Sequence, residues 1–209
     1  MTAVTAQYAS VGRRQVLLIV ILALALSTPW WIVYTCPVQR ALIDEEEVTL
    51  IALKNRRQQP APSDFDQRVT LAALLARGDD RGRWSEQRAA ALEGYVVAVQ
   101  PGAIEFANCL SFTDRDTHID LALGPDAPIT ERMVLEVTPP MREWARQHGL
   151  DWSLAALRAL VGQRARIEGW LLWDLEHVDE SENTNPAQSG NWRRTAWELH
   201  PVTSIRAVD

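Results

Sequence analysis

Histidines with acidic neighbours are the residues of this sequence best suited to chemistry. Three of the four histidines have an Asp or Glu within two positions of them. Imidazole and carboxylate together suit zinc or another transition metal, and the same groups could act as general acid and base. The sequence therefore predicts a candidate divalent-metal set of four residues: His118, Asp120, His177 and His200. The alternative is structural, because a histidine on a solvated strand face commonly pairs with a neighbouring acid.

Residues 174–191 form a second candidate, an acidic loop. It holds five carboxylates, which suggests a cation such as calcium: Asp174, Glu176, Asp179, Glu180 and Glu182. Their spacing fits no EF-hand, and a run of charge is usually a solvated loop. The solvated loop is the favoured interpretation.

The sequence lacks several common catalytic and nucleotide-binding motifs. It contains no GxxxxGK[ST], GxGxxG, HExxH or GxSxG motif. Nucleotide-binding and serine-hydrolase functions therefore have no support.

The elements that must position these residues lie in a domain expected at 84–209. Alternating or β-rich runs predict strands at 94–99, 118–123, 133–138, 164–173 and 194–205, and helices are expected at 141–148 and 153–161. This β-β-β-α-β-β order predicts a mainly β, α+β domain: an OB-fold-like five-stranded barrel. Another small α+β sheet is the alternative. Strands two and five are not adjacent in an OB barrel, so His118 and His200 need not converge.

An uncharged apolar run at 16–34 precedes this domain. About 20 such residues span a bilayer, Arg13 and Arg14 flank one end, and Trp30, Trp31 and Tyr34 lie near the other. The positive-inside rule predicts a cytoplasmic N-terminus at 1–15, a single-pass anchor in the bacterial inner membrane, and a periplasmic or extracellular domain. A cleaved signal peptide is the alternative, because 23–25 (ALA) resembles a cleavage site.

Residues 35–83 are expected to form a helical spacer. Acidic residues open a helix predicted at 44–58, and a second is expected from Ser63 or Asp64 to Gly78. The two cysteines, Cys36 and Cys109, are expected to be unpaired thiols, since two are too few for a disulfide framework.

The charge distribution argues against nucleic acid as a partner. Residues 84–209 hold 11 basic and 19 acidic side chains, a net charge of −8, whereas residues 1–83 hold 10 and 8, a net charge of +2. Nucleic-acid affinity comes largely from basic residues that neutralise phosphates. An acidic domain repels that backbone.

Several stretches resemble a group of uncharacterised bacterial envelope proteins. The resemblance covers roughly residues 94–208 and rests on 116–119 (DTHI), 149–153 (GLDWS), 169–177 (GWLLWDLEH), 181–184 (SENT) and 191–203 (NWRRTAWELHPVT). It implies a common fold with an OB-fold-like C-terminal domain. It does not indicate any particular activity.

Three functions follow from these patterns. The favoured one is a membrane-anchored extracytoplasmic module that binds an envelope protein or ligand, or has a structural role. The alternatives are a metal-dependent hydrolase that uses the histidine and aspartate set, and single-strand nucleic-acid binding by an OB face carrying exposed aromatics.

Overall fold

A computed structural model describes residues 45–208 of the chain. The expected cytoplasmic terminus at 1–15 and the expected transmembrane segment at 16–34 both lie outside these residues. Within the described part, no helix combines the length and the apolar character needed to cross a bilayer.

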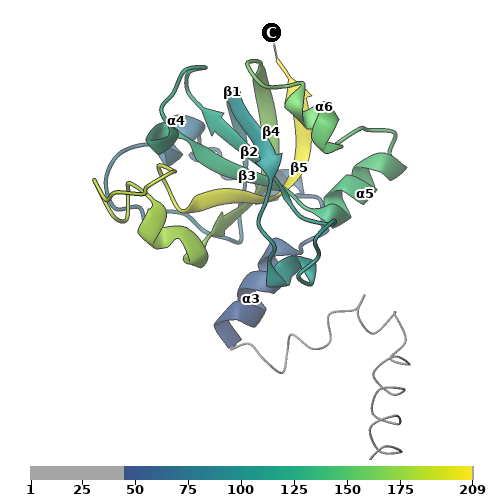
Figure 1. The fold of residues 1–209 in the computed structure, drawn as a ribbon, viewed down its shortest axis with the longest axis horizontal. Helices are drawn as coiled ribbons and strands as arrows, with labels where there is room; N and C mark the ends of the chain where they lie inside the picture. Colours follow the sequence, from purple (N-terminus) through teal and green to yellow (C-terminus); the bar gives the residue numbers. More distant parts are fainter. Residues whose placement is uncertain (1–44, 209) are drawn as a thin grey trace, which may run out of the picture. The chain divides into compact units, whose positions relative to one another are not determined.

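Five strands close into a barrel (Figure 1). They are β1 (Ala89–Pro101), β2 (Thr117–Ala122), β3 (Met133–Val137), β4 (Arg164–Trp173) and β5 (Trp197–Ala207). Their order around the barrel is β1-β2-β3-β5-β4, with β3 and β5 parallel and the other pairs antiparallel. The predicted OB-like α+β barrel is confirmed.

Two helices connect β3 to β4, as the sequence predicts. α5 (Pro139–Gln147) begins at a pair of prolines, which fit the first helical turn because it lacks N–H partners. α6 (Leu154–Arg158) begins after Ser153, whose side chain accepts a hydrogen bond from the Ala156 N–H. Figure 1 shows both helices on one side of the barrel.

The barrel interior is apolar and fully enclosed. Every strand contributes alternate residues to it, because successive side chains of a strand point to opposite faces: Leu92, Val96, Ile119, Leu121, Leu135, Ile167, Leu171 and Leu199. The strand expected at 118–123 would place Leu123 on this face with Ile119 and Leu121, but Leu123 is 58% exposed. That expectation is wrong because β2 ends at Ala122.

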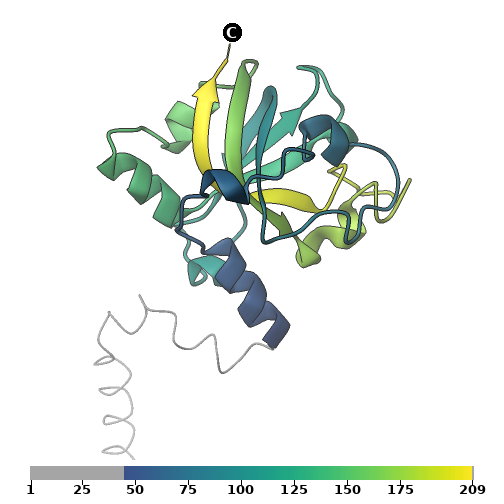
Figure 2. The same ribbon diagram turned by 180° about the vertical axis from the view of Figure 1, so that it is seen from behind.

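The described part of the expected spacer packs against the barrel. The described residues belong to one compact unit, which includes α3 (Glu45–Lys54), the 3-10 helix η2 (Pro62–Asp64) and α4 (Leu71–Leu74). The continuous second helix expected up to Gly78 is absent from this stretch. Thr70 has an extended backbone and caps α4 instead, so that Leu71 and Leu74 enter the core. Figure 2 shows these segments crossing the back of the barrel.

The alternation of core and outward-facing side chains along β5 is interrupted close to His200. Leu199 and Val202 both reach the core although they are three residues apart, and the β4–β5 register shifts on both sides of Gly169. A Cβ atom at Gly169 would lie 2.6 Å from the carbonyl oxygen of Pro201. Glycine is therefore required where the two backbones approach.

Replacing Gly169 with alanine should cost about 1–3 kcal/mol of unfolding free energy, because the methyl group would overpack against β5. Denaturation of the full chain in detergent measures this loss. Gly124→Ala is the matched control, since a Cβ there meets nothing within 4 Å. Equal stability of both variants would show that the close approach is not a constraint.

Candidate functional site

The outer faces of β2, β3 and β5 carry a layer of buried ionisable side chains. Each of the following is at most 8% exposed: His118, Asp120, Glu136, Glu198 and His200. They alternate with the core residues of the same strands, so they point away from the barrel interior. Such burial is rare for charged residues unless they are paired.

Three covering segments seal this layer from solvent. They are α3, the β1–β2 loop with the 3-10 helix η3 (Phe106–Asn108), and the β4–β5 loop with the 3-10 helix η5 (Leu175–Glu180). Figures 1 and 2 both show α3 beside η3, and the Asn55 amide donates to the Ala107 carbonyl at 2.9 Å. We call the buried ionisable groups between these segments and the barrel the charged centre.

Two permanent cations reach into the charged centre. Lys54 is 3% exposed, and its Nζ lies 2.9 Å from Glu105 Oε2 and 2.6 Å from Glu176 Oε2. Burial alone would lower the pKa of Lys54, but the surrounding carboxylates, Glu136 first among them, raise it. Lys54 therefore stays charged and fixes the end of α3 to two loops.

Arg193 is the second cation and is fully buried. Its guanidinium donates to Asp174 Oδ2 at 2.9 Å and to Glu198 Oε1, so it joins the β4–β5 loop to β5. Asp174 also contacts the His177 ring. Burial would raise the pKa of Asp174, but the hydrogen bond from His177 and the charge of Arg193 hold it far below its usual range.

Glu136 on β3 brings together the histidines of β2 and β5. It lies directly opposite His118 in the β2–β3 pair, and its Oε1 is 2.7 Å from His118 Nε2. The contact is an ion pair in which the ring nitrogen is not aligned for a hydrogen bond. Glu136 Oε2 lies 3.4 Å from His200 Nδ1. Burial would lower the pKa of His118, but Glu136 outweighs it and raises the pKa to about 9.

His200 is surrounded by carboxylates. Its Nδ1 also lies 3.4 Å from Glu198 Oε2, and its Nε2 lies 3.8 Å from Asp116 Oδ2. Burial, and then the charge of Glu136, raise the pKa of Asp116 to about 7. The charged centre thus holds more acidic groups than its permanent cations balance.

The four residues of the predicted metal set do not form one group. His118 and His200 approach the same carboxylate, because β3 lies between their strands. The Asp120 carboxylate instead pairs with Arg132 at 3.3 Å, and His177 pairs with Asp174. Within residues 45–208, two sets of ligand atoms gather within 4.8 Å: Asp116, Glu136 and His200, and Glu105, His118 and Glu136.

Sequence reasoning missed the residues that organise the centre, Glu136 above all. One signal could have found it: Glu136 alternates with Leu135 and Val137, so it must face away from the core beside the polar face of β2. Lys54 and Arg193 carry no such signal, because their burial depends on the segments that cover the barrel.

The acidic loop does not form a cation site in this structure. Four of its five carboxylates have separate protein partners: Asp174 binds Arg193, Glu176 binds Lys54, Glu180 accepts from the Trp192 indole, and Glu182 accepts from the Asn191 amide. The loop serves instead as a cover for the charged centre.

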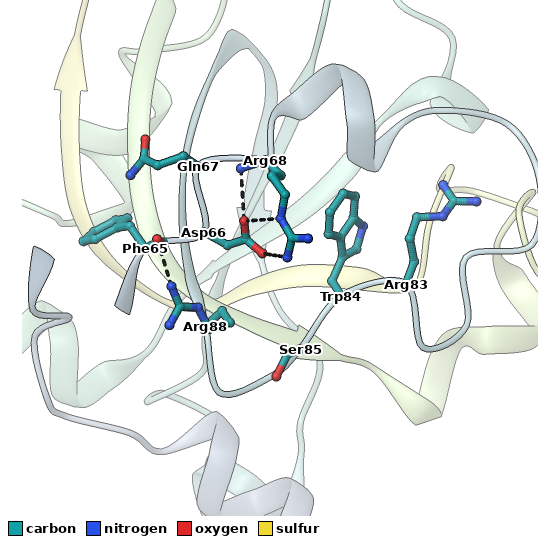
Figure 3. Close-up of a pocket in the computed structure, with 8 residues that line it drawn as sticks. All are labelled: Phe65, Asp66, Gln67, Arg68, Arg83, Trp84, Ser85 and Arg88. Carbon is teal, nitrogen blue, oxygen red and sulfur yellow. Dashed lines mark hydrogen bonds and ion pairs between the residues drawn. The ribbon is translucent and has the colours of Figure 1, made fainter. Parts of the chain in front are cut away.

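Surface clefts lie beside the barrel. One of about 600 Å³ is lined by residues 65–68, residues 83–85 and Arg88. Figure 3 shows Trp84 beside Arg68 in this cleft. The Arg68 guanidinium pairs with the Asp66 carboxylate at 2.7 Å, and Arg88 donates a hydrogen bond to the Phe65 carbonyl. This cleft shares no residue with the charged centre. Another, of about 710 Å³, lies beside α5 and includes Asp116 among its lining residues.

Cys109 takes part in a disulfide bond. The expectation that it is an unpaired thiol is therefore wrong. Cys36 lies outside the described residues.

Comparison with known proteins adds no function to this geometry. No protein-family model matches the sequence, and a search of curated proteins found no match. The functional argument therefore rests on the charged centre and the surface around it.

Replacing Arg193 with methionine should cost about 3–5 kcal/mol of unfolding free energy, because two buried carboxylates lose their shared cation. Adding Glu198→Gln should recover part of this loss, since it removes one of the uncompensated charges. Denaturation of the full chain in detergent measures both effects.

Arg206→Met is the control for this experiment. The Arg206 side chain is 63% exposed and pairs with Glu168 at 3.4 Å, and exposed pairs contribute about 0–1 kcal/mol. If Arg193→Met lowered the free energy of unfolding no more than Arg206→Met does, the buried ion pairs of Arg193 would not contribute to stability.

The pairing of His177 with Asp174 should make stability depend on pH. Burial would lower the pKa of His177, but the hydrogen bond and charge of Asp174 raise it above 6.5. A raised pKa adds stability that is complete below pH 6.5 and is lost as pH rises through the folded-state value. The melting-temperature gap between the wild type and His177→Gln should therefore be largest near pH 6 and should narrow as pH rises above 6.5. A gap that stays constant over this range would contradict the pairing.

Proposed function

We propose that this chain is a single-pass, membrane-anchored module whose OB-like barrel lies outside the cytoplasm and acts by binding an envelope protein. The uncharged run at 16–34 and the flanking Arg13 and Arg14 support the anchor. The disulfide bond at Cys109 supports an oxidising compartment. The resemblance to bacterial envelope proteins points the same way.

One observation carries the binding role. OB barrels take up oligonucleotides and sugars on the face of strands two and three and on the β1–β2 and β4–β5 loops. In this chain α3 and those two loops cover that face over the charged centre, and Lys54 and Arg193 hold them there. The partner protein would therefore bind to the outer surface of the covering segments.

The β1–β2 loop offers an apolar surface for this purpose. Ile104, Leu110 and Phe112 are 41%, 47% and 79% exposed. Exposed apolar side chains gathered on one segment mark interaction sites. We assign the contact with an envelope partner to this loop.

Single-strand nucleic-acid binding has less support. It needs a basic groove with exposed aromatic side chains on which bases can stack. The six tryptophans of the second half of the chain are all buried or half-buried, and residues 84–209 carry a net charge of −8.

The hydrolase alternative has less support, because the candidate groups are buried. His118 and His200 are 8% and 0% exposed, and neither lines the cleft that reaches Asp116. A hydrolase must admit substrate to its catalytic groups, whereas these groups lie beneath the covering segments. A metal ion bound at these groups would stabilise the fold.

Photocrosslinking in intact cells tests the proposed function. A photoreactive amino acid in place of Phe112 should give a discrete adduct with a membrane or envelope protein. The same amino acid in place of Leu123, which is 58% exposed on a different loop, should give none. Adducts of equal yield from both positions, or from neither, would contradict the assignment of the loop.

A reporter fused after Asp209 tests the location separately. A reporter that is active only outside the cytoplasm should be active there. Activity of a cytoplasm-only reporter at the same position would overturn the location.

A further inference from the structure

We infer that Asp116, Glu136 and His200 form a buried site for one divalent transition-metal ion of the zinc class. The inference concerns the stability of the barrel and does not depend on the compartment or partner proposed above. Each residue offers one ligand atom, and these atoms lie within 4.8 Å of one another. They come from three different segments: the end of the β1–β2 loop, β3 and β5.

Each of the three residues has one buried polar atom that makes no hydrogen bond. Asp116 Oδ1, Glu136 Oε2 and His200 Nε2 are buried and accept or donate no hydrogen bond. A buried polar atom without a partner costs free energy comparable to its desolvation. Because the three residues also bring ligand atoms within 4.8 Å of one another, a cation held between them would coordinate groups that now lack a hydrogen bond.

The other polar atom of each residue is held by a neighbour. The Asn108 amide donates to Asp116 Oδ2 at 2.9 Å, His118 pairs with Glu136 Oε1, and Glu198 Oε2 lies 3.4 Å from His200 Nδ1. Metal-binding histidines commonly donate their second ring nitrogen to a carboxylate, and metal-binding carboxylates are commonly hydrogen-bonded in turn. The supporting contacts of such a site are therefore present.

The local charge also favours a cation. Three carboxylates lie within 3.8 Å of the His200 ring, those of Asp116, Glu136 and Glu198. Arg193 also pairs with Glu198, and His118 also pairs with Glu136, whereas Asp116 lies 3.8 Å from the His200 ring. A divalent ion would add positive charge beside this third, more weakly paired carboxylate.

The donor types limit which ion fits. One imidazole nitrogen with two carboxylate oxygens suits zinc and neighbouring transition metals, whereas calcium takes 6–8 oxygen ligands. Zinc bonds of about 2.0–2.2 Å place tetrahedral ligand atoms about 3.4 Å apart. The ligand atoms now lie within 4.8 Å of one another, so binding would draw them inward by up to about 1.4 Å. The cleft beside α5 is lined in part by Asp116.

Metal titration of the full chain tests the inference. The protein is purified in detergent with a tag free of histidine, stripped with a chelator, and titrated with Zn²⁺. Elemental analysis should find one zinc per chain, and zinc should raise the melting temperature. Asp116→Asn and Glu136→Gln should weaken zinc binding at least roughly tenfold and remove the melting shift.

Asp120→Asn is the matched control. Asp120 is a buried carboxylate on the same face of β2, but it pairs with Arg132 and lies outside the donor set. It should keep both the stoichiometry and the melting shift. Zinc bound equally by the wild type and Glu136→Gln would overturn the inference, as would a wild type that retains none.

X-ray absorption of the zinc-loaded wild type keeps the test decisive if the variants do not fold. The inference predicts nitrogen and oxygen ligands only, at about 2.0–2.2 Å, with a single imidazole. Two or more imidazoles, or a sulfur ligand, would contradict it.

Discussion

The charged centre is the constraint on which the rest of this structure depends. Carboxylates on the outer face of the barrel are buried, and such charges are tolerated only when they are paired. Lys54 supplies one cation from α3, and Arg193 supplies another from the β4–β5 loop. The covering segments are therefore held by ion pairs beneath them as well as by apolar packing.

The arrangement of the strands explains why the centre forms where it does. In the order β1-β2-β3-β5-β4, β3 separates the two strands that carry His118 and His200. Glu136 on β3 can therefore contact both. The bulge beside Gly169 lets β5 keep Leu199 and Val202 in the core while His200 faces outward. Apolar packing inside and ionic contacts outside thus share the same three strands.

The sequence was sufficient for the barrel because alternation and turn residues are local signals. β4 begins and ends where the pattern predicts, and α5 and α6 lie between β3 and β4 as expected. The candidate site was only half predictable. His118 and His200 stand out beside acids, but the pairing of Asp120 with Arg132 and the burial of Lys54 depend on contacts between residues far apart in the chain. Such contacts produce no periodic pattern in the sequence from which they could be predicted.

Hydrogen–deuterium exchange of the wild-type chain tests most directly whether the charged centre fixes α3 to the barrel. If it does, the amides of residues 51–55 should be protected to nearly the same degree as those of β2, β3 and β5, because releasing α3 would expose the buried ions and unfold the unit as a whole. Rapid exchange in α3 while the three strands remain protected would contradict the account.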